Sequence, residues 1–197
     1  MPKVSDAHRA SRHDQIINAA LVCFSRNGFH RTSMADIIEE AGLSAGAIYL
    51  HFAGKQDIVW AVAKRVLGTR SRELEAVISG PVLPPPVDLL RLLMDGLTRD
   101  LTDTGLLVQL WGEAVVDSEI GVHVTEVFTA LERDFRAYLT AWVTQSRDLD
   151  QEASAAWALT ALPAMLALGQ GYLLQRALLP DFDSDRYFAA VAALLAD

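Results

Sequence analysis

The stretch S-M-A-D-I-I-E-E-A-G-L-S-A-G-A-I-Y-L-H-F, residues 33–52, predicts two short helices joined by a glycine turn. Ser33 is a good N-cap residue, and Asp36 follows three positions later, as in a capping box. Gly42 can take the positive φ needed to leave the first helix sharply, and Ser44 can cap the second helix. The lengths and spacing are those of a helix-turn-helix.

Small and aliphatic residues in this stretch can close a core between the two helices. Ala35 and Ala41 allow a close approach, and Leu43, Ile48 and Ile38 can fill the space between the helices. The surface that is left on the second helix consists of Ala45, Gly46, Ala47, Tyr49, Leu50 and His51.

The rest of the chain also has helical periodicity. Ala and Leu dominate, and apolar residues recur every three or four positions, so we expect an all-α protein of about nine helices. Residues 1–10 are expected to form a mobile arm, and the segment 80–86, which holds three consecutive prolines, to form an ordered surface connection. The other predicted helices are 11–27, ending at Gly28, 55–79, 88–103, 106–116, 119–147, 151–178, with a kink at Pro163, and 184–196.

The charges are divided unevenly along the chain. Residues 1–72 hold ten Lys or Arg and six Asp or Glu, whereas residues 73–197 hold seven and nineteen, so the first part is basic and the second part more than accounts for the net charge of −8. A basic N-terminal part suits contact with phosphate. We predict a three-helix DNA-binding domain over residues 1–55 and a larger helical domain over residues 56–197.

Several other classes of protein are not supported by the sequence. The polar N-terminus does not resemble a secretory signal, and residues 153–174 form only a weakly hydrophobic run, so we expect a cytoplasmic protein without a membrane partner. Cys23 fits a small buried hydrophobe better than a redox sensor. His123 shares a helix face with Glu119 and Glu126, which we interpret as a solvated charge pair. We therefore expect no metal, no cofactor and no catalytic residue.

Four segments carry a family resemblance: I-I-N-A-A-L-V-C-F (16–24), N-G-F-H-R-T-S (27–33), A-D-I-I-E-E-A-G-L-S (35–44) and A-I-Y-L-H-F-A-G-K (47–55). In these segments the chain resembles the DNA-binding head of the TetR family of transcriptional regulators, over about a quarter of its length from Ile17 to Val62. The Tyr-x-His-Phe-x-x-Lys ending after a Gly-Leu-Ser turn is the most specific part of the resemblance. The C-terminal part has no comparably specific motif.

The resemblance implies a role for each position of the motif. Thr32 and Ser33 would meet a DNA phosphate at the start of their helix, and Lys55 would pair with another phosphate. Tyr49 and His51 would contact phosphates or thymine methyl groups. Ser44 would cap the recognition helix, whose residues Ala45, Gly46 and Ala47 would face base edges. The predicted DNA-binding set is Thr32, Ser33, Ser44, Ala45, Gly46, Ala47, Tyr49, Leu50, His51 and Lys55.

This chain departs from richer family members at positions 45–47. Ala, Gly and Ala offer no side-chain donor or acceptor, so hydrogen-bonded base readout from these positions is excluded. Methyl contacts, close backbone approach and DNA shape remain. We expect Tyr49, Leu50, the arm with Arg9 and Arg12, and DNA deformability to carry much of the specificity.

The C-terminal domain is expected to hold a small apolar or aromatic ligand, as the resemblance implies for its middle helices. The alternative for its aromatic residues is simple core packing. The candidate pocket residues are Met94, Gln109, Trp111, Phe128, Trp142, Met165 and Gln170. The resemblance also implies a homodimer through helices 151–178 and 184–196, in which Gly169 and Gly171 would allow close packing.

These expectations combine into a repressor that binds palindromic double-stranded operator DNA as a dimer. A ligand in the body would move the helix 55–79 and release the DNA. Two alternatives stay open: a DNA-binding protein without a small-molecule ligand, and a helical enzyme. No nucleophile elbow, paired catalytic carboxylates or phosphate loop favours the enzyme.

Overall fold

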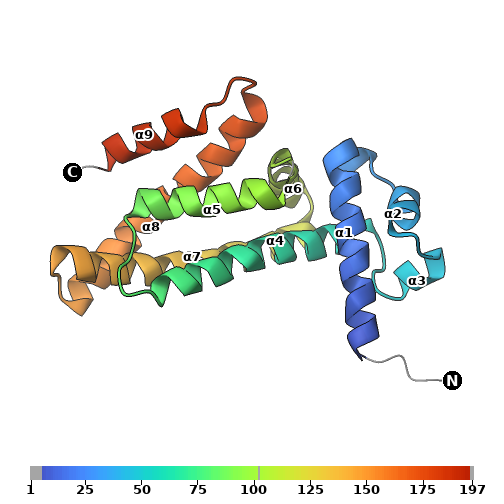
Figure 1. Ribbon diagram of the computed structural model, residues 1–197, viewed down its shortest axis with the longest axis horizontal. Coiled ribbons are helices and arrows are strands. Elements are labelled where there is room, and N and C mark those ends of the chain that lie inside the picture. Colours follow the sequence, from blue (N-terminus) through green and yellow to red (C-terminus); the bar gives the residue numbers. More distant parts are fainter. Residues whose placement is uncertain (1–5, 102, 196–197) are drawn as a thin grey trace. The chain divides into compact units, whose positions relative to one another are not determined.

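The computed structural model describes residues 6–101 and 103–195, and within these residues the secondary structure is helical with no strand (Figure 1). The all-α prediction is therefore confirmed. The chain divides into two compact units, Met1–Arg65 and Val66–Asp197. The predicted domain boundary at residue 55 is the start of the fourth helix, and the two units divide inside that helix. The helices are α1 (Asp6–Arg31), α2 (Met34–Ala41), α3 (Ala45–Tyr49), α4 (Lys55–Ile78), α5 (Pro86–Asp100), α6 (Gly105–Val116), α7 (Ser118–Arg147), α8 (Gln151–Leu178) and α9 (Ser184–Leu194).

The first unit is built on α1, against which α2 packs. The buried face of α1 carries Ile16, Ala20 and Phe24, spaced four residues apart, so one apolar stripe faces the core. Gly28 interrupts the helix with φ 75° and ψ 165°, as a glycine can. The prediction that Gly28 ends the regular part of this helix is confirmed.

The expectation of an arm over residues 1–10 is wrong for residues 6–10. These residues form the first turns of α1, and only residues 1–5 of the predicted arm lie outside the described part. Ser11, chosen as the helix start, lies inside the helix. Ala7 and Ala10 are strong helix formers, which favours a helix that begins before Ser11. Within the helix, Arg12 Nη1 donates to Gln15 Oε1 at 2.8 Å, one turn further along.

The second unit packs α7 along α8, with α6 against both of them. α5 packs on α8 and α9 through a stripe that includes Leu89, Leu93 and Leu97. A Cβ placed on Gly169 in α8 would lie 3.6 Å from Leu90 Cδ1, an ordinary van der Waals distance, so an alanine would also fit against α5. Beside Gly171, the Tyr187 hydroxyl of α9 donates to the Leu168 carbonyl oxygen at 2.6 Å.

The proline-rich connection between α4 and α5 is bound to α7. Tyr138 is fully buried, and its hydroxyl donates to the carbonyl oxygen of Pro84. Gln145 accepts from the Leu83 N–H at 3.0 Å and donates to the Pro81 carbonyl oxygen at 3.1 Å. The prediction of an ordered connection is confirmed, because three hydrogen bonds from α7 fix its path.

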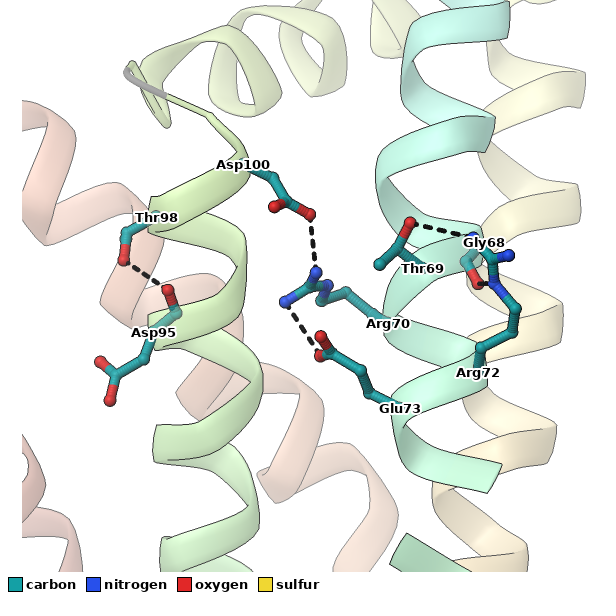
Figure 2. Close-up of polar contacts among 8 residues, drawn as sticks. All are labelled: Gly68, Thr69, Arg70, Arg72, Glu73, Asp95, Thr98 and Asp100. Carbon is teal, nitrogen blue, oxygen red and sulfur yellow. Dashed lines mark hydrogen bonds and ion pairs between the residues drawn. The ribbon is translucent and has the colours of Figure 1, made fainter. Parts of the chain in front are cut away.

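A buried arginine joins α4 to α5 (Figure 2). Arg70 is 5% exposed, and its guanidinium lies 2.6 Å from Asp100 Oδ2 and 2.9 Å from Glu73 Oε2. Gly96 on α5 provides the space, because a Cβ there would lie 1.6 Å from Arg70 Nη1. A buried charge is costly unless it is paired, and two carboxylates pair this one.

Helix α8 has two apolar faces. Ala158, Leu162, Met165 and Gly169 face the core, whereas Leu159, Pro163, Ala167 and Leu174, which recur on the opposite side of the helix, are exposed. This helix is the one segment in the described residues that is long and apolar enough to cross a membrane, with a mean hydropathy of 1.3. By itself that property does not separate a membrane span from a helix that packs on protein, and the helix runs through Pro163 without a break.

Candidate nucleic-acid interface

Both helices of the helix-turn-helix begin at the predicted caps. Ser33 Oγ accepts from the Asp36 N–H at 3.2 Å, and the Ser33 N–H donates to Asp36 Oδ2 at 2.7 Å, which completes the capping box. These hydrogen bonds hold the pKa of the Asp36 carboxyl below its usual value. Gly42 ends α2 with φ 62°, and Ser44 Oγ accepts from the Ala47 N–H at 3.2 Å to start α3. The turn is therefore built as the sequence predicts.

The two helices of the motif are fixed by buried aliphatic side chains and by one amide. Ile48 is fully buried, as predicted, but the buried isoleucine of α2 is Ile37 and not Ile38, and Ala35 is exposed, so α2 turns a different face to the core from the predicted one. Gln15 of α1 donates to the carbonyl oxygen of Ala41 at 2.8 Å, which satisfies a carbonyl at the end of α2. Sequence reasoning missed Gln15, because its partner lies 26 residues away along the chain.

The outer surface of α3 is exposed and mostly apolar. Ala45 and Gly46 are exposed, Ala47 is half-buried, and Tyr49 is 53% exposed. Leu50, the C-cap residue, is 86% exposed. Of these residues, which the sequence predicts to contact DNA, all but the half-buried Ala47 are exposed.

His51 follows this surface and turns back toward α1. Its ring centroid lies 6.3 Å from that of His13, and the His13 ring lies 4.8 Å from buried Phe52. Burial lowers the pKa of His51, and the neighbouring His13 and Arg9 lower it further. At neutral pH the ring is therefore uncharged and can donate one hydrogen bond to a phosphate.

Lys55 and Thr32 are placed differently from what the resemblance implies. Lys55 Nζ donates to the carbonyl oxygens of Phe29 and Thr32, both at 3.0 Å, and lies 4.5 Å from the Phe29 ring centroid. It therefore positions the segment before α2. Thr32 is 1% exposed, and its hydroxyl donates to the carbonyl oxygens of Cys23 and Gly28, so it has no hydroxyl to offer a phosphate. We leave Thr32 out of the proposed interface.

Cys23 lies inside the first unit and does not reach the outer surface of α3. The side chain is buried, and its Sγ lies 3.5 Å from the Asp36 carbonyl oxygen. Burial and the nearby Glu40 and Asp36 carboxylates raise the pKa of the thiol. A protonated, buried thiol is a poor nucleophile, which favours the structural interpretation of Cys23 over the redox one.

The predicted pocket residues of the second unit lie in separate places. Trp111 and Phe128 are half-buried neighbours, with ring centroids 6.0 Å apart. Met94 is buried, and its methyl lies within 4.0 Å of the position of a Cβ on Gly169. The remaining candidates divide into a Trp142–Trp157 ring pair, buried Met165, half-buried Gln109 and exposed Gln170. Gln170 lies on the outer face of α8 and not with Met165.

A groove between α7 and α8 contains none of these predicted pocket residues. It is lined mainly by small and apolar side chains, with Arg133 and Arg136 at its edge. Elsewhere on α7, His123 Nδ1 lies 3.8 Å from Glu126 Oε2. In residues 6–101 and 103–195, no group of three His, Cys, Asp or Glu side chains could hold a metal ion.

A capped helix-turn-helix with an exposed second helix is an arrangement found in DNA-binding transcription regulators. The family model of bacterial regulatory proteins of the tetR family matches residues 16–62, which are about a quarter of the chain. Its relatives and structural neighbours are transcriptional regulators and not enzymes.

The curated relatives match only part of this chain. An uncharacterized HTH-type transcriptional regulator from Bacillus subtilis is 33% identical over 109 residues, which are 55% of this chain and 53% of that protein. An HTH-type transcriptional repressor from Mycobacterium tuberculosis is 36% identical over 77 residues, 37% of this chain and 41% of that protein. The matches thus span about half or less of these relatives.

Solved structures extend the similarity of fold to nearly the whole chain. A transcriptional regulator from Saccharomonospora viridis, crystallised in complex with choline, has a TM-score of 0.71 at 19% identity, over 95% of this chain and 96% of the other. The fold of nearly the whole chain is thus shared with a solved structure.

Proposed function

We propose that this chain is a cytoplasmic one-component repressor that binds palindromic operator DNA as a homodimer and is released by a small-molecule ligand. The observation that carries the proposal is the exposed outer surface of α3, held by capped ends and a buried Ile48. A helix presented in this way fits the major groove. The basic N-terminal part would supply the salt-dependent attraction to phosphate.

The outer face of α8 supports the dimer. Leu159, Leu174 and Leu178 are exposed apolar side chains along this helix, and Leu194 and Leu195 are exposed at the end of α9. An extended apolar face on a globular protein marks a surface that packs on another molecule. A second copy of the chain would cover it with the same surface, as in a two-fold dimer. On this proposal the apolar character of α8 serves dimer packing and not a membrane.

The ligand is proposed to bind in the second unit, near Trp111 and Phe128. This half-buried aromatic pair suits an apolar or planar molecule or a cation. The regulator from Saccharomonospora viridis, which shares the fold, was crystallised with choline. Helix α4 belongs to both units, so a shift of α4 in the second unit would alter the first.

The test is selection of bound sequences from a pool of random duplex DNA by the purified chain. We expect one symmetric motif to be enriched, and raising the salt from about 50 to about 200 mM to weaken binding by a factor on the order of 10³. Tyr49→Ala should abolish selective binding. Val115→Ala, at an 88% exposed position of α6, is the matched control and should bind as the parent does.

Operator binding, the dimer and the role of α3 each fail on a different result. A folded protein that enriches no sequence would overturn operator binding. An enriched motif without two-fold symmetry would overturn the dimer, and a motif bound equally well by Tyr49→Ala would overturn the role of α3.

A further inference from the structure

The first turn of the surface that α3 offers to DNA has almost no hydrogen-bonding side chain, and the Tyr49 hydroxyl follows at its end. Ala45, Gly46 and Ala47 have none, and the Ser44 hydroxyl oxygen already accepts from the backbone. The most exposed residue at this surface is Leu50, at 86%. An exposed leucine side chain is stabilised when an apolar group of a partner removes it from water.

Gly46 leaves open space that the fold does not need. A Cβ at this position would meet nothing within 4 Å, and the backbone there does not require the positive φ that favours glycine. Glycine is nevertheless one of the weakest helix formers, and α3 is only five residues long. The empty space lies on the exposed side of the helix, where a second molecule can approach the backbone closely.

These two observations define the chemistry of the expected partner group. We propose that α3 reads its operator through the 5-methyl groups of thymine, with Leu50 as the contacting side chain and Gly46 as the point of closest approach. The inference rests on the proposed operator binding. In the major groove, adenine, guanine and cytosine present only donors and acceptors, whereas thymine also presents a methyl group. Leu50 can gain a contact from the methyl group alone.

The test replaces thymine by deoxyuridine in the selected operator, which removes only the methyl group. One replacement at the contacted position of a half-site should weaken binding about four-fold, the effect of leaving one methyl group uncovered. The same replacement should have no effect on the Leu50→Ala variant. This variant removes an exposed side chain, so its fold is expected to be unchanged.

A second variant tests the close approach at Gly46. Gly46→Ala should raise the thermal stability of the protein and weaken operator binding, because the new methyl group fills space that the fold leaves open. Gly112→Ala in α6, where a Cβ also meets nothing within 4 Å, is the control. It should raise stability and leave operator binding unchanged.

The outcomes separate this inference from the function on which it rests. If the chain selects no DNA sequence, operator binding itself is overturned. If it selects a sequence but every deoxyuridine operator binds as the thymine operator does, methyl readout alone is overturned. Equal sensitivity to deoxyuridine in Leu50→Ala and in the parent would remove Leu50 from the contact. A stabilised Gly46→Ala that keeps full affinity would remove Gly46.

Discussion

Single side chains in the first unit link its stability to pH. The pKa of His51 lies below its usual value of about 6.5. As the pH falls through that value, the unfolded chain takes up a proton at this position before the folded chain does, so stability falls with it. We expect His51→Gln to lose less stability than the parent between pH 7.5 and pH 5.5, measured by urea unfolding. His13 and Arg9, which repel the charged form of His51, are kept in both proteins. An equal loss in the two proteins would contradict the prediction.

Lys55 provides a second test at the residue scale. Its ammonium group donates to two backbone carbonyl oxygens, each at 3.0 Å, so Lys55→Met leaves both without that donor. Hydrogen bonds to charged groups contribute about 1.5–3 kcal/mol, and we expect Lys55→Met to lose an amount in this range in the absence of DNA. Urea unfolding without DNA measures it. An unchanged stability would show that Lys55 does not position the segment before α2.

At the scale of helices, the sequence predicts what local signals determine. The bounds of α2 and α8 are confirmed, because a side-chain cap, Ser33 or Asp150, marks each start. Helix α5 begins at Pro86, two residues before the predicted start at residue 88, and proline is indeed favoured in the first helical turn. The contacts of Lys55 and Gln15 could not be predicted, because their partners lie 23 and 26 residues away and only the folded chain brings them together.

The sequence also does not reveal the close approach of the Arg70 guanidinium of α4 to Gly96 of α5, and a substitution at Gly96 tests its importance. Gly96→Ala should destabilise the protein by about 1–3 kcal/mol, because the new methyl group would displace the buried Arg70 guanidinium from its carboxylates. Gly112→Ala, at an exposed position of α6, should instead stabilise the protein by up to about 1 kcal/mol. Urea unfolding gives both values. If Gly96→Ala gains stability as Gly112→Ala does, the Arg70 guanidinium can be displaced at no cost in stability. Its ion pairs would then not stabilise the packing of α4 on α5.

At the scale of the whole molecule, the proposed dimer explains why so much of α8 is apolar and exposed. Leu174→Glu places a charge on the outer face of α8, where a second copy would have to bury it unpaired. Leu92→Glu is the matched control, since Leu92 on α5 has a similar exposed fraction, 46% against 43%. We expect sedimentation to give a dimer of the 21.5 kDa chain for the parent and for Leu92→Glu, and a monomer for Leu174→Glu.

The dimer also sets how strongly the chain binds DNA. Two half-sites bound together act at high effective concentration, so a folded Leu174→Glu monomer should lose operator affinity by a factor on the order of 10² or more, although every DNA-facing residue is retained. A gel shift with the selected operator measures this loss, and circular dichroism confirms that the variant is folded. Full affinity in a monomeric Leu174→Glu would mean that one copy of α3 suffices for operator binding. Loss of affinity with the dimer intact would place the outer face of α8 in a different role from dimerisation.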